Sequence, residues 1–213
     1  MRTTLSKYKF KRLAKESLRN SLRLHSDAIL LYTNQSYPSA FQLAVLALEE
    51  LAKSKWVSHY YYSSITNEGF DDAEFEQKWL TLLYSHTEKQ FAFVGRDIFE
   101  YSPKLVRFIK LKQLEQKKQQ SIYVGLERSR KAIDVNSRIS TPERIKKVDA
   151  KQLISLVNRE YLDIFESTIS NDEYFGIKEV DEVINPNVHQ FIFCWPHKTK
   201  LKSTNYFKSH NNE

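Results

Sequence analysis

The feature of this sequence that most constrains its fold is the scarcity of residues that interrupt helices. Only four of the 213 residues are glycine and five are proline. These two residues are the poorest helix formers, and they are also the residues that tight turns between strands prefer. The chain therefore predicts an all-α protein. With 41% apolar residues, it can bury the core of one substantial domain or two small ones.

Apolar periodicity and turn residues divide the chain into segments. A helical bundle is expected, with an extended segment at 121–125, where the sequence reads SIYVG. Residues 185–213 carry two prolines and scattered basic side chains, so we expect an irregular, loosely packed tail. The predicted domains are therefore a helical domain at 1–184 and a basic extension at 185–213. The expected helices cover residues 5–32, 38–65, 73–101, 104–120 and about 140–170.

The charge distribution favours an anionic partner. The net charge is +7, and the positive charge is clustered. Residues 2–23 hold eight Lys or Arg against Glu16 alone, and residues 104–118 hold six against Glu115 alone. Such stretches are either solvated helix faces or tracks for a phosphate backbone such as that of RNA.

The sequence also predicts a cytoplasmic protein. Cys194 is the single cysteine, so no intrachain disulfide is expected, which fits a reducing compartment. The first fifteen residues lack the apolar core of a signal peptide. Residues 28–48 are uncharged, but a polar turn interrupts them, so we expect no membrane span.

The segment LALEELAKSKW, residues 46–56, places charges inside an apolar helix. On a helical wheel Glu50 falls in the middle of an apolar stripe, Lys53 borders it, and Glu49 and Lys55 point elsewhere. A helix that is apolar nearly all round is a central one. We therefore expect Glu50 to be buried.

The segment 73–101 repeats this pattern. If it is one helix, His86 lies in an aromatic stripe with Phe75 and Trp79, and Lys89 and Arg96 follow one edge. A buried carboxylate needs partners, so Glu50 is expected to meet Lys53, His86 or Lys89 across the two helices. One interpretation is a structural pair that fixes helix register; the other is an acid–base site in a groove.

A carboxylate, an imidazole and two ammonium groups suit a ribonuclease that needs neither metal nor cofactor. Histidine can act as base or acid near neutral pH. Glutamate can orient the imidazole or take the proton, and lysine can stabilise the charge on the phosphorane. The expected catalytic residues are Glu50, His86, Lys53 and Lys89. No metal site is expected.

Three short motifs in order give the chain a resemblance to a known family. These are Glu49-Glu50-x-x-Lys53, His86-x-x-Lys89, and a Lys117-Lys118 stretch leading to Ile122-Tyr123-Val124. Together they resemble AbiV, the abortive-infection proteins of the HEPN superfamily, over about residues 28–125.

The resemblance implies a HEPN-type helical bundle, commonly a homodimer with its groove near the interface. It also implies antiphage defence by a toxic ribonuclease or translation-blocking protein that a phage-encoded factor activates. The residues expected to bind RNA are Glu49, Arg96, Lys117, Lys118 and Tyr123.

Two features depart from the family pattern. Gly125 replaces a frequent Asp, and no clear Arg-x(4–6)-His signature is present. Tyr123 either stacks on a base or is a packed tyrosine. Lys53 is either a phosphate clamp or an i,i+4 partner of Glu49.

Three hypotheses follow. The first is an abortive-infection endoribonuclease. The second is a non-enzymatic helical module that binds RNA or a protein and halts growth by sequestration. The third is a purely structural helical dimer.

Overall fold

The computed structural model describes residues 4–67, 69–95, 98–126, 132–171 and 173–203. Within these ranges the regular structure is helical, with two isolated β-bridges and no strand. The prediction of an all-α bundle is confirmed. The elements are α1 Lys7–Thr33, α2 Tyr37–Thr66, α3 Ala73–Leu82, α4 His86–Gly95, the 3₁₀ turn η1 Ile98–Glu100, α5 Pro103–Lys110, α6 Gln113–Gln120, the 3₁₀ turn η2 Pro142–Arg144, α7 Lys147–Asn171, α8 Lys178–Asp181 and α9 Pro186–Phe193.

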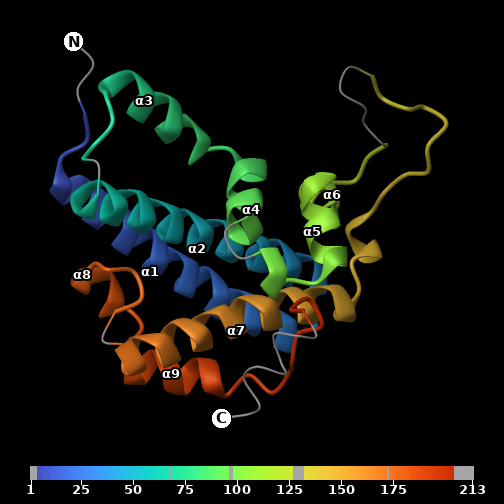
Figure 1. The fold of residues 1–213 in the computed structure, drawn as a ribbon. Helices are drawn as coiled ribbons and strands as arrows, with labels where there is room; N and C mark the ends of the chain where they lie inside the picture. The colour runs from blue at the N-terminus through green and yellow to red at the C-terminus, as the bar shows by residue number, and fades with distance from the viewer. Residues whose placement is uncertain (1–3, 68, 96–97, 127–131, 172, 204–213) are drawn as a thin grey trace.

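The long helices α1, α2 and α7 form the centre of the molecule (Figure 1). The first two are close to the expected ranges, and Pro38 lies in the first turn of α2 as expected. Fully buried leucine, isoleucine and aromatic side chains fill the space between the three helices. Because α2 is enclosed by the other elements, it buries side chains on nearly every face.

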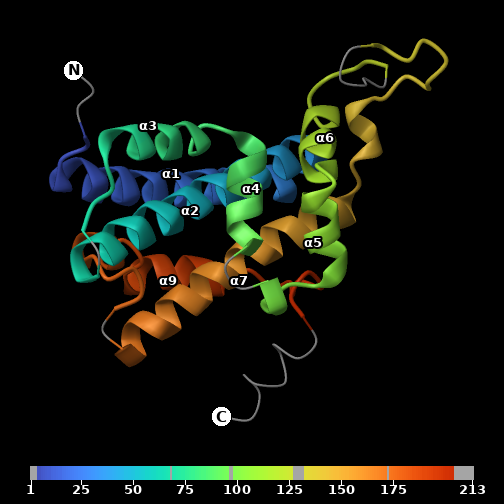
Figure 2. The same cartoon turned by 45° about the horizontal axis from the view of Figure 1, so that its top comes forward.

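The prediction of one helix over residues 73–101 is wrong. The chain leaves helical geometry after Leu82, where Tyr84 N donates to Thr81 O and Ser85 N donates to Leu82 O. These i→i−3 bonds tighten the turn and end α3. A new helix, α4, then crosses α2 (Figure 2). His86 is therefore the first residue of α4, and it does not continue the face that carries Trp79.

The expected helix over 104–120 is also broken. Lys112 has φ 57°, a left-handed conformation that separates α5 from α6. The segment after α6 leaves the helix as expected, and Gly125 pairs with Ser140 in an isolated antiparallel bridge. Helix α7 begins at Lys147, several residues later than expected.

The described part of the C-terminal tail is packed, contrary to the expectation of a loose extension. Ile192 of α9 is fully buried, and Trp195 Nε1 donates to Ser155 Oγ at 2.8 Å. Lys202 is buried and its Nζ lies 2.5 Å from Glu160 Oε1. Buried ammonium groups persist only when they are paired, so this contact ties the tail to α7. The domain boundary at 184/185 stays a prediction.

The buried Glu160 predicts a pH-dependent stability. Burial raises the pKa of its carboxyl, but the ammonium groups of Lys55 and Lys202 lower it more, and the resulting pKa is about 2. A lowered pKa stabilises the folded protein above the ordinary value of 4.5, and this stabilisation is lost as the pH falls toward 2. We expect Glu160→Gln to be less stable than wild type by an amount that shrinks by about 2 kcal/mol between about pH 5 and about pH 3. Urea denaturation at several pH values measures this difference, and a constant difference would contradict the assignment.

None of the described helices is both long enough and apolar enough to cross a bilayer.

Candidate functional site

Side chains from three helices meet where α4 and α6 contact α2 (Figure 1). They form one connected network of hydrogen bonds and ion pairs. We call this group the Glu49 cluster, and its members are Glu49, Glu50, Lys53, His86, Lys89, Gln90, Glu115 and Lys118.

Glu49 is the centre of this cluster. Its side chain is 0% exposed. Glu49 Oε2 lies 2.6 Å from His86 Nδ1, and Oε1 accepts from Gln90 Nε2 at 2.7 Å and from Lys118 Nζ at 2.9 Å. A buried carboxylate is tolerated only when its oxygens are hydrogen-bonded and its charge is compensated. Four donors, counting Lys89 Nζ at 3.8 Å, meet this requirement.

The prediction that Glu50 is the buried acid is wrong. Its side chain is 16% exposed and pairs with Lys53 Nζ at 3.2 Å. Lys89 Nζ lies 3.5 Å from Glu50 Oε1. Glu50 thus meets two of the three expected partners, while His86 contacts Glu49 instead. Lys53 pairs with Glu50, three residues earlier. The alternative of an i,i+4 pair between Glu49 and Lys53 is therefore wrong.

The carboxylate of Glu115 lies beside that of Glu49. Glu115 Oε2 lies 2.7 Å from Lys118 Nζ and 2.9 Å from Gln90 Nε2. Lys118 and Gln90 therefore each bridge the two acids. Burial raises the pKa of Glu115, but hydrogen bonds from Lys118 and Gln119 and the charge of Lys118 lower it more, so the net pKa falls below its ordinary value.

His86 is the member of the cluster that reaches furthest into solvent, with a side chain 51% exposed. Its Nδ1 is engaged by the Glu49 carboxylate, and Nε2 has no partner among the described residues. A carboxylate at Nδ1 favours the tautomer with the proton on that nitrogen, which leaves Nε2 as an acceptor, and it also stabilises the imidazolium. The ring is therefore held in place by a buried group and presents a basic nitrogen outward.

The cluster is close to electrical balance when His86 is neutral. Three carboxylates, Glu49, Glu50 and Glu115, face three ammonium groups, Lys53, Lys89 and Lys118. Histidine is the one side chain of these types that ordinarily gains and loses a proton near neutral pH. Histidine chemistry therefore makes His86 the member of the cluster best suited to proton transfer.

The ligand types also raise the question of a metal ion. Ligand atoms of Glu49, His86 and Glu115 all lie within 4.8 Å of one another. However, Lys118 Nζ and Gln90 Nε2 already lie between the two carboxylates, at hydrogen-bond distance from both. Donor groups in that position compete with a cation for the same oxygens. The arrangement thus fits proton transfer better than metal binding.

The residues expected to bind RNA are not all in the cluster. Lys118 belongs to it but is only 4% exposed. Lys117 points away, because its Nζ pairs with Asp149 at 2.6 Å and lies 5.6 Å from the Phe41 ring. Tyr123 is 62% exposed, so the packed-tyrosine alternative is wrong. Arg96 lies outside the described residues.

Three residues near the site were missed from the sequence. Gln90 lies four residues after His86 on α4, and Glu115 lies three residues before Lys118 on α6. This spacing places each pair on one helix face, so it is a usable signal. Tyr84 is 73% exposed, and its ring lies 6.0 Å from Lys53 Nζ. Its position depends on the break between α3 and α4, which the sequence did not reveal to us.

The molecule is an all-helical bundle, as expected for a protein of the HEPN type. The model of the AbiV family matches residues 9–162. The chain therefore belongs to the AbiV family of the HEPN superfamily, whose members are abortive-infection proteins. The match extends from α1 into α7, well beyond the motifs that carried the resemblance. Among curated proteins and among solved structures there is no match.

Proposed function

We propose that this protein is a metal-independent endoribonuclease that acts in abortive infection. The observation that carries the proposal is the contact of 2.6 Å between the buried Glu49 carboxylate and His86 Nδ1, with the imidazole half exposed. A histidine held in this way is prepared to exchange protons with a ligand. Of the residues expected to be catalytic, His86 keeps its role, and Glu49 replaces Glu50 as its acidic partner.

The proposed reaction is an attack within the RNA backbone. His86 Nε2 accepts the proton of a ribose 2′-hydroxyl, and the 2′-oxygen forms a bond to the adjacent phosphorus. The bond from phosphorus to the 5′-oxygen breaks, and that oxygen takes up a proton. The products are a 2′,3′-cyclic phosphate and a 5′-hydroxyl. Glu49 stabilises the imidazolium formed during the step.

The phosphate is proposed to bind beside His86. Glu50 holds Lys53 and Lys89 in the same cluster as His86, and we propose that their charges stabilise the phosphorane. Lys53, with 14% of its side chain exposed, is the more accessible of the two, since the Lys89 side chain is 9% exposed. The exposed ring of Tyr84 offers a surface on which a base can stack. Lys118 is buried between Glu49 and Glu115, so we assign it to holding the cluster together rather than to binding RNA.

A second proton carrier is needed to protonate the leaving 5′-oxygen. One imidazole supplies one proton transfer in a single displacement step. We propose that a homodimer places a second His86 beside the first, in line with the dimeric arrangement that the family resemblance implies. A phage-encoded protein is the proposed activator of this assembly.

The proposal is tested by incubating the purified protein with RNA in the presence of EDTA. We expect cleavage without added metal, fragments that carry a 2′,3′-cyclic phosphate and a 5′-hydroxyl, and no cleavage of DNA, which lacks the attacking group. Analysis of the fragment ends by mass spectrometry reads out the mechanism. Cleavage that appears only after Mg²⁺ or Mn²⁺ is added would instead assign Glu49, His86 and Glu115 as metal ligands.

A further inference from the structure

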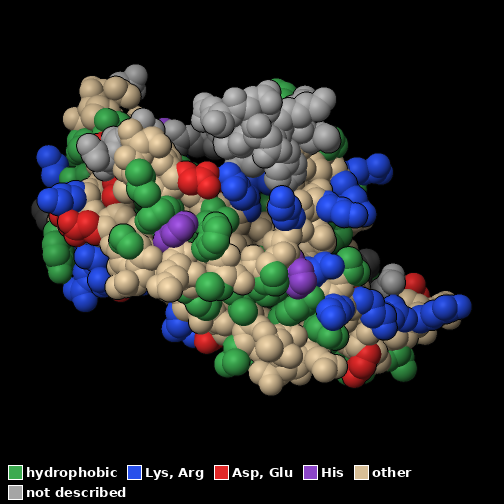
Figure 3. All heavy atoms as spheres, turned by 90° about the horizontal axis from the view of Figure 1, so that it is seen from below, with side chains coloured by type: hydrophobic (Ala, Val, Ile, Leu, Met, Phe, Trp, Pro, Cys, Tyr) green, Lys and Arg blue, Asp and Glu red, His purple; other side chains and the backbone are tan. Residues whose placement is uncertain are grey.

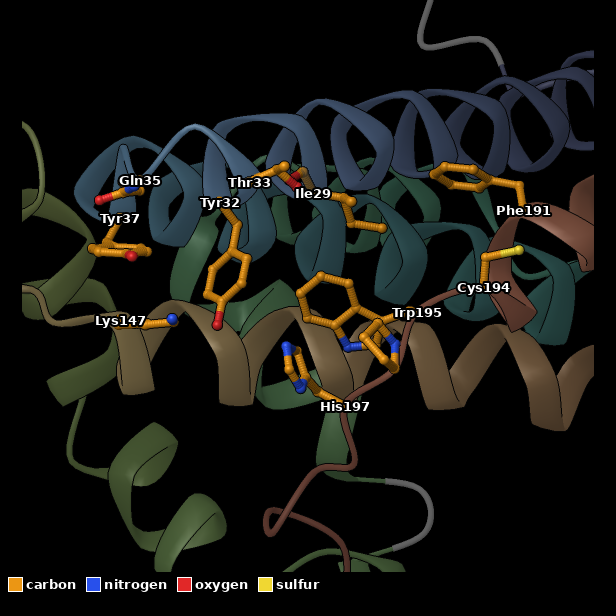
Figure 4. Close-up of a pocket in the computed structure, with 11 residues that line it drawn as sticks. Ile29, Tyr32, Thr33, Gln35, Tyr37, Lys147, Phe191, Cys194, Trp195 and His197 are labelled. Carbon is orange, nitrogen blue, oxygen red and sulfur yellow. The ribbon is translucent and has the colours of Figure 1, made fainter.

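A cavity of about 540 Å³ lies between the end of α1, the start of α7 and the tail after α9 (Figure 4). Its volume falls in the range of small-molecule sites. The residues that line it are separate from the Glu49 cluster, and the proposed cleavage chemistry uses none of them. They include Tyr32, Tyr37, Lys147, Trp195 and His197.

Aromatic rings form much of the wall of this cavity. The Tyr32 ring makes edge-to-face contacts with Tyr37 at 5.5 Å, Trp195 at 5.3 Å and His197 at 6.0 Å between centroids. Trp195 is fixed further by its hydrogen bond to Ser155. Rings held in this way lose little conformational freedom when a planar group packs against them. The wall therefore favours an aromatic guest.

The charges around the cavity are positive. Lys147 lines it, and Lys151 lies close enough for its charge to act on His197, another lining residue. Burial lowers the pKa of His197, and the nearby charges of Lys151 and Lys147 lower it further. Seen from below, the surface carries several groups of lysine and arginine side chains (Figure 3). These charges disfavour the cationic guests that aromatic cages otherwise bind, and they favour an anion.

The hydroxyl of Tyr32 adds a polar group that lacks a partner. Tyr32 is 7% exposed, and its hydroxyl is buried without a hydrogen bond in the structure. This oxygen points between Lys147 and His197 (Figure 4). A buried polar group without a partner is unfavourable, so such groups are rare unless a ligand or a water satisfies them. The hydroxyl is thus placed to bond a polar edge of a guest.

We propose that this cavity binds a nucleotide, with the base against the Trp195 and Tyr32 rings and the phosphate at Lys147 and Lys151. The same chemistry is present in a free nucleotide and in one unit of a single-stranded RNA. Either occupant would act as a second ligand of the protein, apart from the Glu49 cluster.

Binding is measured by isothermal titration calorimetry on the full-length protein with AMP, adenosine, inorganic phosphate and a short single-stranded oligoribonucleotide. Three variants test the three contacts: Trp195→Ala, Lys147→Glu and Tyr32→Phe. We expect the first two to weaken binding by about tenfold or more, as loss of stacking or of a charge contact does. Tyr32→Phe removes one hydroxyl and should weaken binding by about two- to tenfold. Lys110→Glu, an equal charge change on α5, is the control and should leave AMP binding unchanged.

The binding results distinguish the two possible occupants. Binding of AMP that the cavity variants weaken supports a free nucleotide, and binding of the oligonucleotide alone with the same sensitivity supports an RNA unit. The proposal is overturned if neither probe binds, or if both bind equally well to wild type, Trp195→Ala and Lys147→Glu. Adenosine that binds as tightly as AMP would overturn the phosphate contact. Thermal unfolding confirms that each variant is folded, and no part of the test depends on RNA cleavage.

Discussion

His86→Ala is expected to reduce RNA cleavage by about 10²- to 10⁴-fold, the usual contribution of a general acid or base. The side chain is half exposed and lies at the first position of α4. The substitution should leave the helix and the core packing intact, but it removes the hydrogen bond to Glu49 Oε2, so a modest loss of stability is also expected. A loss of activity far larger than this loss of stability would separate a catalytic role from a structural one. Gel assays of RNA cleavage and thermal unfolding measure the two effects.

A histidine outside the cluster provides the control for this variant. His59→Ala changes an exposed position on α2 and should leave cleavage unchanged. If His86→Ala keeps both RNA binding and toxicity on expression, the nuclease proposal is wrong and the non-enzymatic module becomes the better account. Charge reversals on the basic face of α1 should then abolish both effects.

Glu49→Ala is expected to have the largest effect on stability, about 3–5 kcal/mol, because it removes one partner of buried ion pairs. Lys118 and Gln90 would each lose the carboxylate to which they donate, and the buried charge of Lys118 would keep Glu115 as its acidic partner. Glu50→Ala is the matched neighbour and should lower the free energy of unfolding less, since Glu50 is partly exposed. Urea denaturation compares the two variants. An equal or larger loss for Glu50→Ala would contradict the assignment of Glu49 as the central acid.

The all-helical fold and the long helices α1 and α2 could be predicted from the sequence. Their predictions depend on apolar periodicity and on the turn that carries Pro38, both of which are local signals. The sequence also identified the motif residues that meet at the cluster. Glu49, Lys53, His86, Lys89 and Lys118 lie together in space although they come from three helices.

The sequence could not decide which of two adjacent acids is buried. Because α2 is enclosed on nearly all sides, a helical wheel has no clear solvent face from which to orient Glu49 and Glu50. The choice is made by tertiary contacts, since α4 and α6 pack over the side of α2 that carries Glu49.

The breaks that end α3 and α5 were also not predicted from the sequence. Neither Tyr84 nor Lys112 is a residue that strongly predicts a turn, so the local sequence did not indicate where α3 and α5 end. The packing of the tail was missed for a related reason. Lys202 is buried and pairs with Glu160 and Asp163. These acids lie 42 and 39 positions earlier in the chain (202 − 160 and 202 − 163), and such a distant pairing leaves no periodic pattern in the sequence.

The proposed mechanism requires that Glu49 acts through His86. A double-mutant cycle on kcat/KM tests it, with wild type, Glu49→Gln, His86→Ala and the double variant assayed on one RNA in EDTA. Residues that act as a unit show strongly non-additive losses. We expect Glu49→Gln to slow the wild type by about tenfold or more and to have no further effect once His86 is alanine. Losses that multiply in the double variant would show that the two side chains act independently, and the proposed mechanism would be wrong.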